Sequence, residues 1–411
     1  MKKKRFSELL APAGNFEKLK TALHFGADAV YLGGKDFSLR SFADNFTADE
    51  MKRAVETAHA AGKKVYVTAN IFARNADFSA LSDYFRFLSE IGADAALVTD
   101  AGVFAAARAA APALKLHLST QANTTNKYAA KFWYGEGAER VVLARELSVA
   151  EISEIRDFCP ELQLEAFVHG AMCISYSGRC LLSNYLAGRD SNRGECVQAC
   201  RWKYEVRAEG ASCPVEEDAR GTYIFNSKDL NLIGHLKELS EAGVDSFKIE
   251  GRMKSAYYLA TVVNAYRRAF DRLAGKPSAF SDADIFGELK KCAHRDFTTA
   301  YALGENEKTV NYADSQTKGT CDFVAEVKEG GERSALVEMR NRFRVGETLE
   351  ILSPTDTCNQ KFVVDSLCDA EGNPVEDAKL VQQTLRIGCP YLLRAGDILR
   401  RPVADKNKRR K

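Results

Sequence analysis

Four cysteines near the middle of the chain are the residues whose type and spacing point most directly to chemistry. They are Cys173, Cys180, Cys196 and Cys200, with six, fifteen and three residues between successive members. Thiolates are soft ligands, and four of them suit either zinc or an iron–sulfur cluster. A structural zinc site usually has two pairs of ligands, each with about two to four residues between its members, and only the last two cysteines fit. The spacing therefore favours a 4Fe–4S cluster, with a zinc site as the second interpretation. The remaining alternative is four unrelated loop thiols that bind no metal.

The rest of the composition is that of an ordinary globular protein. The 411 residues carry a net charge of +2, and no long apolar stretch follows the basic start or occurs later. We therefore expect no signal peptide and no membrane contact, and a cytoplasmic location, where structural disulfides are rare. Metal binding then becomes the leading explanation for some of the eleven cysteines. The basic ends (1–5 and 406–411) are either solvated tails or contacts for phosphate groups.

Charged residues occur in two apolar runs that should be buried strands. Alternation places Glu165, Phe167 and His169 on one face of the first run. It places Lys248, Glu250 and Arg252 on one face of the second. Buried charges need a partner or a function, and for Glu165 a stabilising ion pair is an equal alternative. We expect the catalytic residues to be His169, Glu165, Lys248 and Glu250.

A second group of polar residues could hold a substrate. Asn70 and Gln121 lie where apolar runs end, and their amides can form hydrogen bonds there. Candidates for two-pronged binding of a carboxylate or phosphate are the guanidinium groups of Arg40, Arg145, Arg179 and Arg252. We expect the substrate-binding residues to be Arg179, Arg252, Asn70, Gln121 and Tyr176.

The elements that must position these residues repeat along the first half of the chain. Short apolar runs alternate with amphipathic helical stretches, which is typical of buried parallel strands in an α/β protein. Seven runs precede residue 171 and an eighth follows at 246–251, so we predict a (β/α)8 TIM-like barrel, with an open doubly wound sheet as the alternative. The runs are 8–14, 28–34, 64–70, 95–100, 115–121, 140–147, 162–170 and 246–251.

The rhythm breaks after the seventh run and again in the last third of the chain. Residues 171–221 are rich in Cys, Gly, Ser and Arg, and we interpret them as an insertion at the barrel mouth. We assign two further strand-like runs, 203–207 and 222–226, to a hairpin that belongs to this insertion. Residues 322–404 alternate apolar and polar residues between turn signals, which predicts a small C-terminal β-barrel domain. The expected domains are 1–280 for the barrel with its insertion, 281–321 as a bridge, 322–404, and a basic tail at 405–411.

Several motifs together resemble one known family. The run from Glu165 to Ser183, EAFVHGAMCISYSGRCLLS, is similar to the signature of the collagenase-like peptidase family U-32. The segments 8–14 (ELLAPAG), 227–230 (SKDL) and 248–254 (KIEGRMK) match the same family. The length and the C-terminal β-domain most resemble its tRNA hydroxylation branch.

This resemblance implies a function and several partners. It implies a 4Fe–4S cluster on Cys173, Cys180, Cys196 and Cys200, prephenate as co-substrate, and hydroxylation of the wobble uridine in a tRNA anticodon loop to 5-hydroxyuridine. It also implies a need for iron–sulfur assembly machinery. The alternatives are a U-32-type collagenase-like peptidase and a hydroxylase acting on another RNA. The sequence contains no His-Glu-x-x-His and no Gly-x-Ser-x-Gly, and a peptidase would leave Cys196 and Cys200 without a role.

Overall fold

The structure is a computed structural model that describes residues 8–39, 44–202, 226–304, 309–310 and 317–403. The two basic ends, residues 203–207 and 222–225 of the expected hairpin, and Arg40 lie outside these ranges. The chain forms two compact units, which we describe separately. The first contains Met1–Leu19, Ala27–Lys254 and Arg295–Gln316, and the second contains Lys20–Gly26, Ser255–His294 and Thr317–Lys411. No helix in the described ranges is long and apolar enough to cross a membrane.

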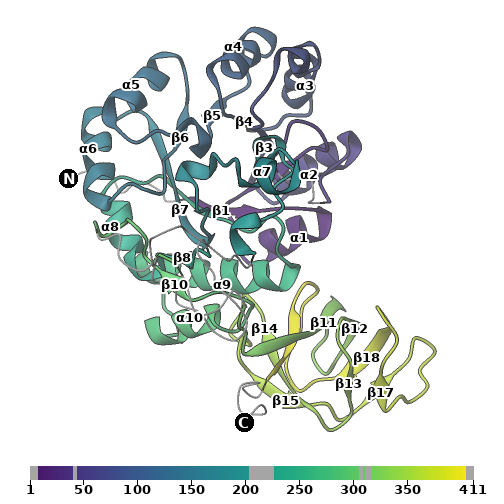
Figure 1. Cartoon of the computed structure of the whole chain (residues 1–411). Coiled ribbons are helices and arrows are strands. Elements are labelled where there is room, and N and C mark those ends of the chain that lie inside the picture. The colour runs from purple at the N-terminus through teal and green to yellow at the C-terminus, as the bar shows by residue number, and fades with distance from the viewer. Residues whose placement is uncertain (1–7, 40–43, 203–225, 305–308, 311–316, 404–411) are drawn as a thin grey trace, which may run out of the picture. The chain divides into compact units, whose positions relative to one another are not determined.

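The first unit is built around a closed parallel barrel, which confirms the predicted fold (Figure 1). Each strand pairs with the next, and the last strand pairs with both the first and the seventh, so the sheet closes. Nearly all strand residues are buried, which explains the continuous apolar runs in the sequence. The barrel strands are β1 (Glu8–Pro12), β2 (Ala29–Gly33), β3 (Lys64–Ala69), β4 (Ala95–Val98), β5 (Leu116–Leu118), β6 (Arg140–Val142), β7 (Gln163–Ala171) and β9 (Ser246–Ile249).

The helices between these strands begin and end at recognisable residues. Thr47 and Ser148 cap their helices, and each forms a reciprocal pair with a glutamate three residues later. Glycines end two of the helices, because Gly92 and Gly137 adopt positive φ angles of 75° and 93° just after α3 and α5. The helices are α1 (Phe16–His24), α2 (Ala48–Ala60), α3 (Phe78–Glu90), α4 (Ala101–Ala110), α5 (Lys127–Gly135), α6 (Val149–Phe158), α7 (Leu182–Ala187) and α8 (Leu236–Glu241).

The seventh strand carries two features that the sequence did not predict. Strand β8 (Asp229–Asn231) pairs antiparallel with the end of β7, and β10 (Phe297–Thr298) pairs with β8. The register of β7 against β9 also shifts, because Phe167 pairs with Lys248 whereas His169 pairs with Ile249. A bulge of this kind changes which side chains point into the barrel beyond it.

The second unit contains the expected C-terminal β-domain as an antiparallel sheet. Seven strands pair in the order β15-β14-β19-β11-β12-β18-β16, and among the described residues β15 and β16 do not pair with each other. The unit also contains helices α9 (Ala256–Leu273) and α10 (Asp282–Leu289), whereas the expected division assigned residues up to 280 to the barrel. Its strands are β11 (Cys321–Glu329), β12 (Ser334–Met339), β13 (Phe343–Arg344), β14 (Thr348–Leu352), β15 (Lys361–Val363), β16 (Leu367–Cys368), β17 (Asp377–Ala378), β18 (Thr384–Gly388) and β19 (Ile398–Pro402).

A buried arginine joins helix α10 to this sheet. Arg400 on β19 is fully buried and donates hydrogen bonds to Glu288 on α10 (2.8 Å) and to Glu350 on β14 (2.8 Å). Burial works against the charged form of Arg400, but the two carboxylates more than offset it and raise its pKa. Removing either carboxylate would leave charge unpaired in the interior, so this contact fixes α10 to the sheet.

Candidate functional site

A chain of charged side chains runs through the barrel interior. Glu8 accepts hydrogen bonds from Arg140 (2.7 Å) and from the Tyr66 hydroxyl (2.7 Å). Arg140 also donates to Glu165 (3.1 Å), and the second oxygen of Glu165 accepts from the Lys248 ammonium (2.7 Å). Burial alone would raise the pKa of Glu8, but the Arg140 guanidinium and the hydrogen bonds lower it. Each buried charge in this chain is therefore compensated by a neighbour.

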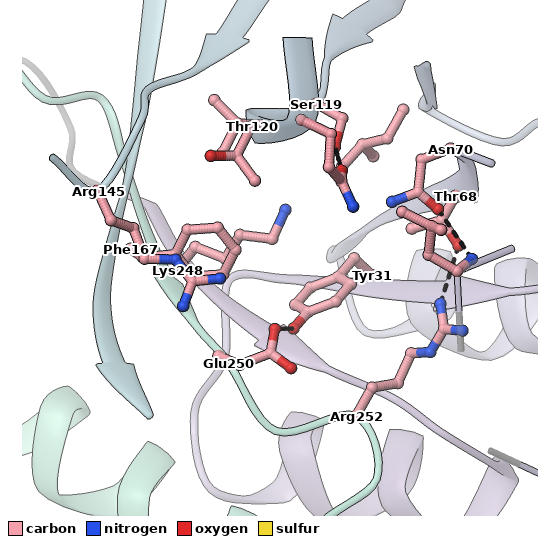
Figure 2. Close-up of a pocket in the computed structure, with 14 residues that line it drawn as sticks. Tyr31, Thr68, Asn70, Ser119, Thr120, Arg145, Phe167, Lys248, Glu250 and Arg252 are labelled. Carbon is pink, nitrogen blue, oxygen red and sulfur yellow. Dashed lines mark hydrogen bonds between the residues drawn. The ribbon is translucent and has the colours of Figure 1, made fainter. Parts of the chain in front are cut away.

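This series of charged side chains ends at a small cavity at the barrel mouth, shown in Figure 2. Lys248 lies at its floor, with the ammonium nitrogen 4.5 Å from the ring centroid of Tyr31 and 5.3 Å from that of Phe167. Arg145 stacks over the same Phe167 ring at 4.2 Å. Two cations on aromatic faces, with Arg252 also in the lining, give this cavity positive charge beside apolar rings.

Arg252 is held rigidly in the wall of this cavity. Its guanidinium is buried and donates hydrogen bonds to Thr68 (2.9 Å), Ser38 (2.7 Å) and Asn45 (3.2 Å). Gly33 provides the space, because a Cβ there would lie 2.6 Å from an Arg252 nitrogen. Arg252 was expected in the site from the sequence, but the residues that orient it were not. Of these, only Thr68, near the end of a strand, gave any signal.

Glu250, Asn70 and Gln121 also line the mouth cavity, as expected for site residues. Glu250 is the only acidic side chain in this lining among the described residues. The Tyr31 hydroxyl donates to the Ile249 carbonyl (2.9 Å) and contacts Glu250 at 3.5 Å. The amide oxygen of Asn70 accepts from the Leu39 backbone N–H (3.3 Å), and that of Gln121 accepts from the Ser119 hydroxyl. Both amide groups are thus oriented before any ligand binds.

The structure places two of the expected catalytic residues away from the cavity lining. Glu165 is fully buried beneath Lys248, so it contacts the cavity only through that ammonium. His169 pairs with Ile249 after the β7 bulge, whereas Lys248 and Glu250 face the cavity. His169 packs instead against Phe297, with ring centroids 5.7 Å apart. The alternation expected from Glu165 to His169 is therefore wrong at its last residue, because the bulge reverses the face.

A second cavity, of about 340 Å³, is lined by Cys173, Cys180, Cys196 and Cys200. It shares Thr120, Gln121, Arg145 and Glu250 with the mouth cavity, so the two are contiguous. Burial raises the pKa of Cys200 to about 11, with the other three thiols adding to the effect. In the described residues no three His, Cys, Asp or Glu side chains already form a compact ligand set. The donors are nevertheless soft sulfurs with Glu250 as the sole acidic neighbour in the lining, which fits iron–sulfur or zinc chemistry.

Comparison with known proteins decides the family. The model of peptidase family U32 matches residues 14–312, and the model of the U32 C-terminal domain matches residues 319–400. The chain belongs to peptidase family U32. It is 43% identical to tRNA hydroxylation protein P1 of Bacillus subtilis, over 90% of this chain and 89% of that protein. It is 36% identical to tRNA hydroxylation protein P of Escherichia coli, over 96% and 98% of the two chains.

Two further proteins are similar to parts of this chain. The 23S rRNA 5-hydroxycytidine C2501 synthase of Escherichia coli is 35% identical over 79% of this chain, which is 46% of that protein. Among solved structures, the U32 peptidase Mk0906 aligns with a TM-score of 0.40 and 14% identity, covering 61% of this chain and 96% of that one. The two family models that match the chain confirm the family resemblance expected from the sequence motifs.

In this U32 chain hydrogen bonds hold the loop that carries the four cysteines (residues 171–202, the cysteine loop) against the barrel rim. Glu146 accepts from the backbone N–H (2.7 Å) and the hydroxyl (2.9 Å) of Ser177. The two carboxylate oxygens of Asp77 accept hydrogen bonds from the two terminal nitrogens of Arg193, at 2.7 and 2.9 Å. These two bonds are the largest cause that lowers the pKa of Asp77 to about 2. The expected ligand residues Arg179 and Tyr176 lie on the outside of this loop, and neither lines the two cavities.

The pair between Asp77 and Arg193 should keep the cysteine loop closed against the rim. Replacing Asp77 with asparagine removes the charge and one of the two matched acceptors. We expect faster hydrogen–deuterium exchange in residues 190–202 than in the native protein, with exchange in strands β1 to β4 unchanged. As a control, Asp83→Asn changes an exposed aspartate on α3. Equal exchange of the loop in both variants would show that the pair does not hold it.

Proposed function

We propose that this protein is a tRNA-modifying enzyme that hydroxylates the wobble uridine to 5-hydroxyuridine, with prephenate as co-substrate and a 4Fe–4S cluster. The observation that carries the proposal is the continuity of the two cavities. A cationic, aromatic-lined pocket opens directly beside a wall of four thiols. The names of the U32 relatives supply the reaction class.

The cluster would be held by Cys173, Cys180, Cys196 and Cys200, and it would supply an electron-transfer centre beside the pocket. The chain's own contribution is positioning. Asp77 and Glu146 anchor the loop that carries the thiols. Loading would require iron–sulfur assembly machinery, and we place the protein in the cytoplasm with its tRNA substrate.

The mouth cavity offers what a small dicarboxylate needs. Arg252, Lys248 and Arg145 provide positive charge, and the rings of Tyr31 and Phe167 offer apolar faces. Prephenate has one carboxylate on a six-membered ring and a second carboxylate on the side chain of that ring, so we assign it to this cavity. Glu250 is then the acid–base group nearest the bound molecule. An anticodon loop presents unpaired bases that can enter without breaking a helix.

A peptidase has less support. A nucleophilic serine or cysteine needs an adjacent base. The Ser177 hydroxyl instead donates to Glu146, and His169 packs against Phe297 outside the two cavities. The described residues therefore do not show a serine paired with His169.

The proposal is tested by tRNA analysis and by one arginine variant. A deletion strain should lack 5-hydroxyuridine-type nucleosides in mass spectra of its tRNA. With purified enzyme, Arg252→Gln should raise the KM for prephenate roughly 100-fold, because it removes a charged two-pronged donor. Arg86→Gln, at an exposed arginine on α3, is the matched control. Unchanged tRNA, or an unchanged KM in Arg252→Gln, would refute the respective part of the proposal.

A further inference from the structure

The outer surface of the cysteine loop exposes aromatic rings. Tyr176 precedes the cavity-lining Ser177 and is 55% exposed. Tyr185 lies on α7, whose first residues line the cysteine cavity, and is 81% exposed. Trp202 follows the last cysteine of the set and is 43% exposed. Three large rings thus face solvent near the cysteine cavity, and none of the three lines it. Packing within the described residues therefore does not explain why these residues are aromatic.

The same surface is rich in arginine. Residues 171–202 contain four arginines and two acidic residues, and no lysine. Arg179 and Arg189 are exposed, and Arg189 lines a groove together with Trp202, while Arg193 is the arginine held by Asp77. The Arg179 guanidinium is fixed from behind, because its Nε donates to the Gln121 carbonyl (2.7 Å) and it stacks at 5.3 Å over Phe72.

A shallow groove lies between Arg189 and Trp202 on this surface and the cysteine cavity. Its lining includes Arg189, Trp202 and Arg201. Cys196, Gln198 and Arg201 line both the groove and the cavity. A chain lying in the groove could therefore pass its neighbouring unit directly into the cavity.

We propose that Tyr176, Tyr185 and Trp202, with Arg179 and Arg189, form a stacking platform for single-stranded RNA. On this proposal, which rests on the proposed function, the platform binds the unpaired nucleotides that flank the target base. Exposed rings and arginines on one loop suit this partner, because bases stack on the rings and phosphates pair with the guanidinium groups. An apolar protein partner would leave the arginine excess without a counterpart.

Binding measurements on the full-length, iron-loaded protein test the platform. The probe is a fluorescein-labelled anticodon stem-loop RNA, followed by fluorescence anisotropy. Tyr185→Ala should raise the Kd about tenfold, because one base loses its stacking partner. Tyr128→Ala is the matched control, since Tyr128 is also a largely exposed tyrosine (69% exposed) on α5, where it packs edge-on against Phe158. A duplex RNA of the same stem sequence without the loop should bind both variants equally, because it has no unpaired bases to stack.

Cross-linking locates the contact independently. Stem-loops with 4-thiouridine beside the target base should cross-link to Tyr185 or Trp202, and the adducts can be mapped by mass spectrometry. Trp133 on α5 is the other tryptophan of the chain and should not react. Circular dichroism and iron content matching the native protein would show that each variant is folded.

The outcomes separate the platform from the proposed function. If Tyr185→Ala and Tyr128→Ala bind the stem-loop equally, or if cross-links fall only outside residues 171–202, the platform is refuted even where the enzyme hydroxylates tRNA. If the stem-loop binds through the platform and no 5-hydroxyuridine forms with prephenate, the proposed function fails and the platform stands.

Discussion

Replacing Cys196 with alanine is expected to abolish stable iron binding. Native protein purified without oxygen should contain about four irons and four sulfides per chain and absorb visible light, as a 4Fe–4S cluster does. The variant should be nearly colourless and should form no 5-hydroxyuridine. The reason is geometric, because Cys196 is one of four thiols around one cavity and the described lining contains no other thiol to replace it.

A matched control separates loss of a ligand from loss of a cysteine. Cys159 is buried at the end of α6, and it contributes to neither cavity. Cys159→Ala should keep the iron, the sulfide and the colour of the native protein. A native protein that is iron-free, or a Cys196→Ala variant that binds iron like the native one, would refute the cluster assignment. One zinc per chain in place of iron would show that the four cysteines form a zinc site instead.

Replacing Glu165 with alanine should have the largest effect on stability. Glu165 is completely buried and is the shared partner of Arg140 and Lys248. Its removal leaves two buried cations with less compensation, so we expect the free energy of unfolding to fall by about 3–5 kcal/mol. Chemical denaturation followed by circular dichroism measures this change.

The control for this variant is an exposed ion pair. Glu154→Ala removes the partner of Lys127 on the barrel surface, and it should cost at most about 1 kcal/mol. A loss in Glu165→Ala no greater than that of Glu154→Ala would show that the interior chain of charges does not stabilise the barrel. Glu165→Gln, which keeps a hydrogen-bonding oxygen, should fall between the two.

The barrel could be predicted from sequence because each of its signals is local. Buried strands appear as continuous apolar runs, and glycines such as Gly92 and Gly137 mark the helix ends. The short strands β13, β16 and β17 were missed because two residues cannot show a period. β8 was missed for a related reason, since three residues that pair antiparallel to the end of β7 show no alternation of their own.

The candidate site could be predicted only in part, because its remaining features depend on pairing between distant strands. The grouping of four cysteines around one cavity follows from their positions in one loop. The outward turn of His169 depends on a register shift against a strand about 80 residues away in sequence, which no local pattern reveals. The same holds for Glu165, whose partner Arg140 is recognisable only when β6 and β7 lie side by side.

The way the barrel closes also sets an order of events during synthesis. Glu8 on β1 pairs with Ser246 on β9, 238 residues later, so the sheet cannot become a cylinder until that last strand has left the ribosome. All four cysteines precede β9 in the chain, and Cys200 emerges roughly 50 residues before it. At about 5–20 residues per second, the thiols are outside the ribosome for several seconds while the barrel is still open. Because the cysteines come before the last strand in the chain, their thiols are accessible in the nascent protein before the barrel beside them is complete.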